Sequence, residues 1–150
     1  MLLKDKVCVV VGAASLRSIG FGVVDLFVEH GAKVVAVDLA MNDAVQADIK
    51  TAIEGRLQRS VQLDGLRCDI SQPEACDQLV RDVVERHGAI DCLVNSAGIV
   101  KSTSLLDISS QELDIMLQVN LKGAFHLCQS VLKAFVEQGS GNIVNVSSLA

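Results

Sequence analysis

The residues best suited to chemistry form a glycine-rich turn, residues 12–22, that follows an apolar run and contains three glycines. Gly12 permits a tight turn out of a strand, and Gly20 and Gly22 let a phosphate and a sheet approach the next helix closely. Ser18 is the expected N-cap of that helix, whose first amides would point at an anion. The turn therefore predicts a cradle for a pyrophosphate. The turn alone fits equally an ordinary strand-to-helix connection with packing glycines.

Asp38 stands at the end of the second apolar run. A carboxylate at this position accepts hydrogen bonds from both hydroxyls of an adenosine ribose, which is typical of NAD binding. A 2′-phosphate about 4 Å away would meet a repulsion of about 1 to 4 kcal/mol, depending on the effective dielectric. The sequence therefore favours NAD over NADP, and Arg17, within the turn, is the residue that argues for NADP. The alternative for Asp38 is a helix N-cap or a solvated loop acid.

Short apolar runs alternate with helical patterns along the whole chain. The runs are rich in β-branched residues and are apolar at odd and even positions alike, as expected for parallel strands covered on both faces. Strands are predicted at 7–11, 34–37, within 61–69, at 90–94 and at 143–146. Helices are predicted at 19–30, at 42–56, between Ser71 and Gly88, and at 110–138. Ser71 and Glu74 predict a capping box at the start of the third helix. The alternation predicts a single α/β domain over residues 1–150, a Rossmann-type doubly wound parallel sheet with strand order 3-2-1-4-5.

The predicted helix at 110–138 carries more apolar residues than one stripe facing a sheet can hide. A helix that is apolar on most faces is buried on two sides, by its own sheet and by another subunit. We therefore expect a homodimer or homotetramer that associates through this helix.

Composition limits the classes of partner. The 150 residues have a formal net charge of −5 and no run of Lys or Arg, which argues against nucleic-acid binding. Apolar stretches are too short to span a bilayer, and the first residues lack a secretory pattern, so we expect a cytoplasmic protein without a membrane anchor. The five cysteines are spaced irregularly and are interpreted as small core residues, so no metal site is expected.

The chain resembles the short-chain dehydrogenase/reductase family over essentially its whole length. Beyond the turn and Asp38, the resemblance rests on Cys68-Asp69-Ile70, Asn95-Ser-Ala-Gly98, the segment 119–125 around Asn120, and the segment 141–148 that ends in Ser148. It implies that Asp69 binds the adenine amino group. The implied cofactor-binding residues are Gly12, Ser15, Ser18, Ile19, Gly20, Asp38, Leu39, Asp69, Ile70, Asn95, Ala97 and Gly98.

The resemblance also implies a reaction, the transfer of hydride between a nicotinamide cofactor and a secondary alcohol or ketone. Ser148 would orient the substrate oxygen, and Asn120 would brace a helix and a water that relays protons. Ser147 competes for the role of Ser148, but strand alternation, with the register taken from the resemblance, favours Ser148.

Two departures from the family pattern matter. The glycine-rich turn is longer than the usual pattern by two residues and resembles that of bacterial enoyl reductases. In the family, a Tyr-x-x-x-Lys pair supplies the acid/base, whereas this sequence contains no tyrosine and is truncated before the sixth strand. The alternative function is therefore a catalytically inactive NAD-binding fragment or a non-enzymatic dinucleotide-binding module.

Overall fold

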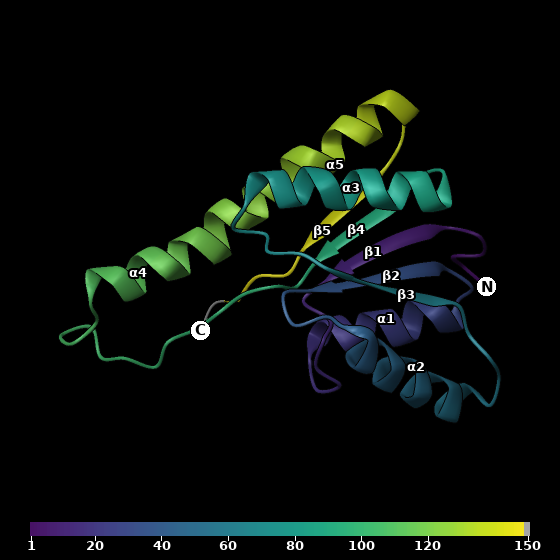
Figure 1. Cartoon of the computed structure of the whole chain (residues 1–150), viewed down its shortest axis with the longest axis horizontal. Coiled ribbons are helices and arrows are strands. Elements are labelled where there is room, and N and C mark those ends of the chain that lie inside the picture. The colour runs from purple at the N-terminus through teal and green to yellow at the C-terminus, as the bar shows by residue number, and fades with distance from the viewer. Residues whose placement is uncertain (149–150) are drawn as a thin grey trace.

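Parallel strands form one sheet in the computed structural model, which describes residues 1–148 (Figure 1). The strand order is β3-β2-β1-β4-β5, which confirms the predicted topology. Each strand pairs in parallel with its neighbours, so the carboxyl ends of all five strands lie at the same edge. The strands are β1 (Val7–Val11), β2 (Lys33–Asp38), β3 (Leu63–Arg67), β4 (Cys92–Asn95) and β5 (Asn142–Asn145).

Helices cover both faces of the sheet (Figure 1). One face carries α1 (Ile19–Glu29) and α2 (Asp43–Leu57), and the other carries α3 (Pro73–His87) and α5 (Ala124–Gln138). The remaining helix, α4 (Ser110–Leu117), continues into α5 through the π-helical turn η1 (Gln118–Gly123). In Figure 1, α4 projects beyond the sheet like an arm.

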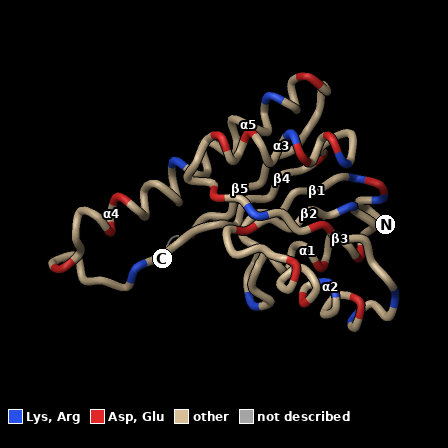
Figure 2. Tube along the Cα trace, in the orientation of Figure 1, with Lys and Arg blue, Asp and Glu red and all other residues tan. Residues whose placement is uncertain are grey.

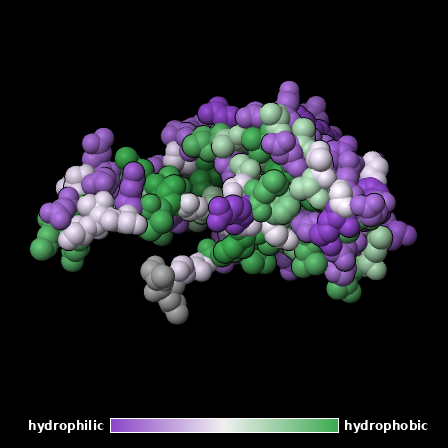
Figure 3. Space-filling model, turned by 90° about the horizontal axis from the view of Figure 1, so that it is seen from below, coloured by the Kyte–Doolittle hydropathy of each residue, from purple (hydrophilic) through white to green (hydrophobic). Residues whose placement is uncertain are grey.

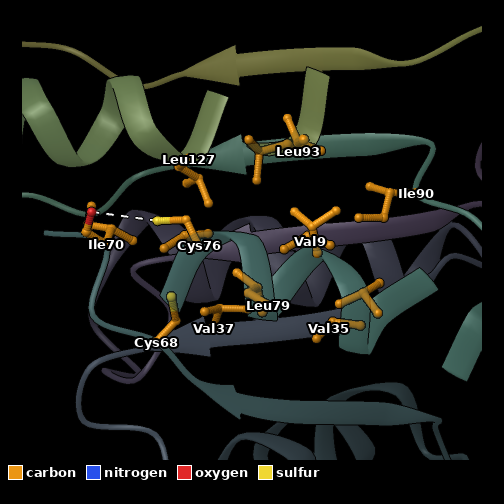
Figure 4. Packing of buried hydrophobic residues seen from close by; sticks show 14 of the residues in the cluster. Val9, Val35, Val37, Cys68, Ile70, Cys76, Leu79, Ile90, Leu93 and Leu127 are labelled. Atoms are coloured by element: carbon orange, nitrogen blue, oxygen red, sulfur yellow. Dashed lines mark hydrogen bonds between the residues drawn. The ribbon is translucent and has the colours of Figure 1, made fainter. Parts of the chain in front are cut away.

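Alternation along the strands creates two hydrophobic layers. Val9, Leu93 and their neighbours of the same parity pack with α3 and α5, where Leu127 is fully buried (Figure 4). Val10 and Val94 belong to the second layer, which packs with α1 and α2. Because both faces of each central strand are covered, both parities must be apolar, and this explains the uninterrupted valine runs.

The predicted single helix at 110–138 is interrupted. Its first part, α4, contributes no buried residue, and η1 separates it from α5. The π-helical turn η1 packs closely on the segment after β3: a Cβ on Gly123 would lie 2.8 Å from Ile70 Cγ1. A regular helical pattern contains no signal for such a contact, since the contact joins segments distant in sequence. Within residues 1–148, the side of this helix that faces the sheet is buried in α5 only, and its cover by another subunit stays a prediction.

The predicted capping box at Ser71 is wrong. The N-cap of α3 is Gln72, without a side-chain hydrogen bond, and the Ser71 amide donates instead to Asp69 Oδ1 at 3.0 Å. A reciprocal capping box does form, but at the start of α4, between Ser109 and Glu112. The Asp69 carboxylate, and not a serine side chain, therefore holds the backbone just before α3.

Acidic and basic side chains are intermixed over the trace (Figure 2). No helix within residues 1–148 combines the length and apolar character needed to cross a bilayer. Apolar residues gather where the α4 arm joins the body and at the tip of the arm (Figure 3). Leu105 and Leu106, which precede α4, and Leu121 in η1 are among the exposed apolar residues.

Candidate functional site

The glycine-rich turn leaves β1 at the carboxyl edge of the sheet. Gly12 has a φ of +88°, and a Cβ at this residue would lie 2.7 Å from the Ala97 amide nitrogen. A Cβ on Gly20 would collide with the Gly12 carbonyl and lie 2.8 Å from Ser96 Oγ. These two glycines therefore allow the turn to pack on the loop after β4. The predicted close approach of the sheet to Gly22 is wrong, because a Cβ there would meet open space.

Ser18 caps α1, as the sequence predicts. Its Oγ accepts a hydrogen bond from the Phe21 amide at 3.0 Å and donates one to the Ser15 carbonyl at 2.8 Å. The positive end of the α1 dipole therefore lies at the turn. This local electrostatic field suits an anion such as a pyrophosphate.

Asp38 ends β2 and is half-buried beside the turn. Its Oδ2 accepts from the Ala14 amide and its Oδ1 accepts from the Ala40 amide, both at 3.0 Å. A carboxylate has about four acceptor positions, so each oxygen retains a lone pair for a further donor. The side chain can therefore hold the turn and still accept hydrogen bonds from two ribose hydroxyls.

Asp69 and Ile70 follow β3 at the same edge. The Asp69 carboxylate accepts from the Ser71 amide, and the Ile70 carbonyl accepts a hydrogen bond from the Cys76 thiol at 3.6 Å. Ile70 is buried, and its side chain packs closely on Gly123. The segment is therefore held from both sides, by α3 and by η1.

Asn95 ends β4 and is a buried polar residue, 4% exposed. Its Oδ1 accepts from the Ala97 amide at 3.2 Å, and its Nδ2 donates to Asn145 Oδ1 at 3.3 Å. These bonds orient the loop that ends at Gly98 and tie it to β5. Asn95 therefore fixes the position of the loop after β4 without itself lining the candidate cleft.

Asn120 lies in η1 and forms two hydrogen bonds with one backbone unit. Its Oδ1 accepts from the Ile99 amide and its Nδ2 donates to the Ile99 carbonyl, each at 2.8 Å. Ser148 is exposed and lies just beyond Val146, whose amide donates to the Asn95 carbonyl at 2.8 Å. Asn120 thus holds the loop after β4, and Ser148 follows the strand that borders it.

A cleft of about 290 Å³ opens where these strand ends meet. Most of the predicted cofactor-binding residues line it, namely Gly12, Ser15, Ser18, Asp38, Leu39, Asp69, Ile70, Ala97 and Gly98. The predicted residues outside the lining are Ile19, Gly20, Asn95, Asn120 and Ser148. A larger groove of about 700 Å³ lies between α3 and α5, away from the glycine-rich turn and the strand ends.

Several lining residues were missed from the sequence: Val11, Cys68, Ser96, Ile99 and Val119. Cys68 and Ser96 each stand beside a predicted site residue at a strand end, so position at the carboxyl edge was the available signal. Val119 reaches the cleft from η1, and no local pattern could have indicated that approach.

The cleft fits a dinucleotide. It combines a glycine turn at a helix N-terminus, a carboxylate with acceptor positions to spare and a second carboxylate at the next strand end. Such clefts outside the carboxyl ends of parallel strands, where the strand order reverses, are the usual ligand sites of open α/β sheets. Here the reversal falls between β1 and β4, where the loops after both strands meet.

Residues 6–150 match the sequence profile of the family described as short chain dehydrogenase. A 3-oxoacyl-acyl-carrier-protein reductase (FabG) of Thermotoga maritima is 36% identical over 149 residues, covering 99% of this chain and 58% of that protein. A D-threitol dehydrogenase of Mycolicibacterium smegmatis is 34% identical over 148 residues, covering 99% of this chain and 54% of that protein.

Solved structures agree with this assignment. The crystal structure of an NAD+-bound xylitol dehydrogenase superposes with a TM-score of 0.87 at 28% identity, covering 100% of this chain and 55% of that one. The match spans the strand order and the helices on both faces. The fold is therefore a Rossmann-type doubly wound sheet, and the chain belongs to the short-chain dehydrogenase/reductase family. It spans less than two thirds of the length of the curated relatives that it matches, for example 58% of the Thermotoga maritima protein.

Proposed function

We propose that this chain is the NAD-binding part of an oxidoreductase that transfers hydride between a nicotinamide cofactor and a secondary alcohol or ketone. The observation that carries the proposal is the meeting of the glycine-rich turn, Asp38 and Asp69 around one cleft at the carboxyl edge. The names of the relatives, a 3-oxoacyl reductase and two polyol dehydrogenases, support a carbonyl or carbinol carbon as the reacting centre.

Each residue has a proposed task in cofactor binding. The turn with Ser15, Ser18, Ile19 and Gly20 faces the pyrophosphate, and Asp38 accepts hydrogen bonds from the ribose, which favours NAD over NADP. Leu39, Asp69 and Ile70 hold the adenine. Asn95, Ala97 and Gly98 form the floor on which the nicotinamide half rests. Bound NAD supplies the hydride acceptor.

The chain offers two residues for the substrate side. Ser148 hydrogen-bonds the substrate oxygen and orients it, and Asn120 acts as a positioning residue that holds the loop after β4 through Ile99. Serine and asparagine side chains do not titrate near pH 7, and residues 1–150 contain no tyrosine. We therefore propose that residues 1–150 bind NAD without turnover. The tyrosine-free sequence also favours a second candidate, a non-catalytic dinucleotide-binding module.

Calorimetric titration of residues 1–150 with NADH tests the proposal. We expect saturable binding at one site that Gly12→Ala weakens, because a Cβ there displaces the turn from Ala97. Steady-state assays of residues 1–150 with secondary alcohols and NAD should give no turnover. Absence of NADH binding would reject both candidates, whereas turnover by residues 1–150 would show that another group serves as acid/base.

We further propose a homodimer or homotetramer in the cytoplasm, assembled through the α4–α5 face, with small-molecule substrates and no nucleic-acid partner. Phe125 is 61% exposed and Val136 is 78% exposed on α5, with Leu121 and Leu132 along the same helical stretch. Burying several hundred Å² of such surface at about 25 cal/mol/Å² favours association. Light scattering should show oligomers that Val136→Glu shifts to smaller species; a monomer at micromolar concentration would contradict the proposal.

A further inference from the structure

Two cysteines lie beneath the adenine end of the cleft. Cys68 directly follows β3, and Cys76 lies in the first turns of α3; both belong to the core layer under α3 and α5 (Figure 4). Cys76 is fully buried and Cys68 is 4% exposed. The Cys76 thiol donates to the Ile70 carbonyl, drawn as a dashed line in Figure 4. The pair therefore holds the segment Asp69–Ile70 at both ends.

Figure 4 shows the Cys68 sulfur pointing towards Cys76, and the interaction of the two thiols makes them chemically different. Once Cys68 loses its proton, the single S–H of Cys76 turns from the Ile70 carbonyl to the Cys68 thiolate, and this lowers the pKa of the Cys68 thiol and raises the pKa of the Cys76 thiol. The thiolate is the nucleophilic form of cysteine, so Cys68 is the more reactive member. Cys76 stands beside it as a resolving thiol.

The two cysteines also differ in their access to the candidate cleft. Cys68 lines the candidate cofactor cleft together with Asp69 and Ile70, whereas Cys76 is not among the lining residues. A small reagent in the cleft therefore meets Cys68 first. A dinucleotide that fills the adenine end of the cleft covers the same sulfur.

We propose that Cys68 and Cys76 form a site of reversible oxidation by hydroperoxides, and that the resulting disulfide opposes dinucleotide binding. In the first step the Cys68 thiolate attacks a peroxide oxygen, the O–O bond breaks, and a sulfenic acid and an alcohol or water form. In the second step the Cys76 sulfur attacks the Cys68 sulfur, the S–O bond breaks, and water leaves with the Cys76 proton. Two thiols are oxidised and one peroxide is reduced.

The coupling to the cleft follows from the contacts of Ile70. Disulfide formation removes the S–H donor from the buried Ile70 carbonyl, and an unmet buried acceptor is costly. Ile70 cannot shift freely towards η1, because its side chain already packs closely on Gly123. The strain therefore falls on Asp69 and the adenine end. By thermodynamic linkage, whatever oxidation does to dinucleotide affinity, the dinucleotide does equally to the oxidation equilibrium.

A second thiol pair provides an internal control. Cys8 and Cys92 are register partners on β1 and β4, and the interaction of the two thiols raises the pKa of Cys8 and lowers the pKa of Cys92. Neither residue lines the candidate cleft. Oxidation of this pair should therefore be insensitive to a dinucleotide.

Peptide mass spectrometry of the purified protein tests the proposal, which rests on the proposed cofactor site. Trypsin cleaves after Arg67 and Arg81, so Cys68 and Cys76 fall on one peptide, residues 68–81. After hydrogen peroxide treatment and alkylation without reductant, we expect this peptide to lose two hydrogen atoms and to escape alkylation. Dithiothreitol should reverse the change. Saturating NADH should slow this oxidation, because it covers the Cys68 sulfur in the cleft, and should leave Cys8 and Cys92 unaffected.

Binding measurements on variants complete the test. Peroxide should weaken NADH binding by about tenfold in the unmodified protein and in Cys92→Ser. Cys76→Ser, which keeps a hydroxyl donor for Ile70, should be resistant; Cys68→Ser provides a second resistant variant if Cys76→Ser does not fold. A peptide 68–81 that never loses two hydrogens would overturn the disulfide, and a loss unaffected by bound NADH would overturn the coupling. A disulfide that forms in a protein unable to bind NADH would instead reject the proposed function.

Discussion

Replacing Asp38 with asparagine tests whether a negative charge determines cofactor choice. The carboxylate accepts from the amides of Ala14 and Ala40, so it carries its charge at the point where β2 meets the glycine-rich turn. Asparagine keeps the size of the side chain and one acceptor oxygen, but removes the charge. Its NH₂ group must face one of the two backbone amides, and that hydrogen bond is lost.

The expected magnitude follows from Coulomb's law. A 2′-phosphate about 4 Å from the carboxylate is repelled by about 1 kcal/mol in water and by about 4 kcal/mol at an effective dielectric of 20. Asp38 is half-buried, so the repulsion lies between these two limits. At about 1.4 kcal/mol for each tenfold change, the Kd ratio of NADPH to NADH should fall by a factor of roughly 5 to 700 in Asp38→Asn.

Calorimetric titration with NADH and NADPH measures this ratio directly. Asp114→Asn makes the same charge change on the projecting α4 helix and should leave the ratio unchanged. Salt should reduce the effect of Asp38 only partly, since half-buried charges are screened less than exposed ones. An unchanged ratio in Asp38→Asn would refute the electrostatic reasoning. Tighter binding of NADPH by the unmodified protein would refute it as well, and would direct attention to Arg17.

Three further outcomes are expected. Gly12→Ala should lower the free energy of unfolding by more than about 1 kcal/mol because of its positive φ and its contact with the loop after β4, whereas Gly22→Ala should be neutral or stabilising; urea titration compares them, and equal effects would contradict the packing argument. The Ser130 hydroxyl, and then Lys133, hold the pKa of the Asp77 carboxyl below its ordinary value, so its stabilising contribution is complete above the unfolded pKa of about 3.9 and is lost as the pH falls through the folded pKa. Asp77→Asn should therefore flatten the acid limb of a plot of urea midpoint against pH, and an unaltered limb would argue against this contribution. In a catalytically competent protein that contains this chain, Ser148→Ala should reduce kcat strongly with little change in the Kd for NADH; a matching loss of NADH affinity would assign Ser148 to cofactor binding.

The strands and helices were predictable because they depend on local patterns, and the strand order followed from the general topology of doubly wound sheets. Valine runs apolar on both parities require cover on both faces, and helical stripes between them supply it. The Ser18 cap was predictable for the same reason, since its partner amide at Phe21 is only a turn away. Residues at the ends of these strands then necessarily share one edge.

The sequence by itself therefore determined the sheet, its helices and the residues at its carboxyl edge, because these follow from periodicities that each segment carries alone. Only the tertiary structure decided the π-helical turn at η1, the hydrogen bonds of Asn120 with Ile99 and the place of Cys68 in the cleft. Each of these depends on contacts between segments far apart in the chain, such as Gly123 against Ile70. Such a contact gives neither segment a repeating sequence pattern, because it depends on both segments at once.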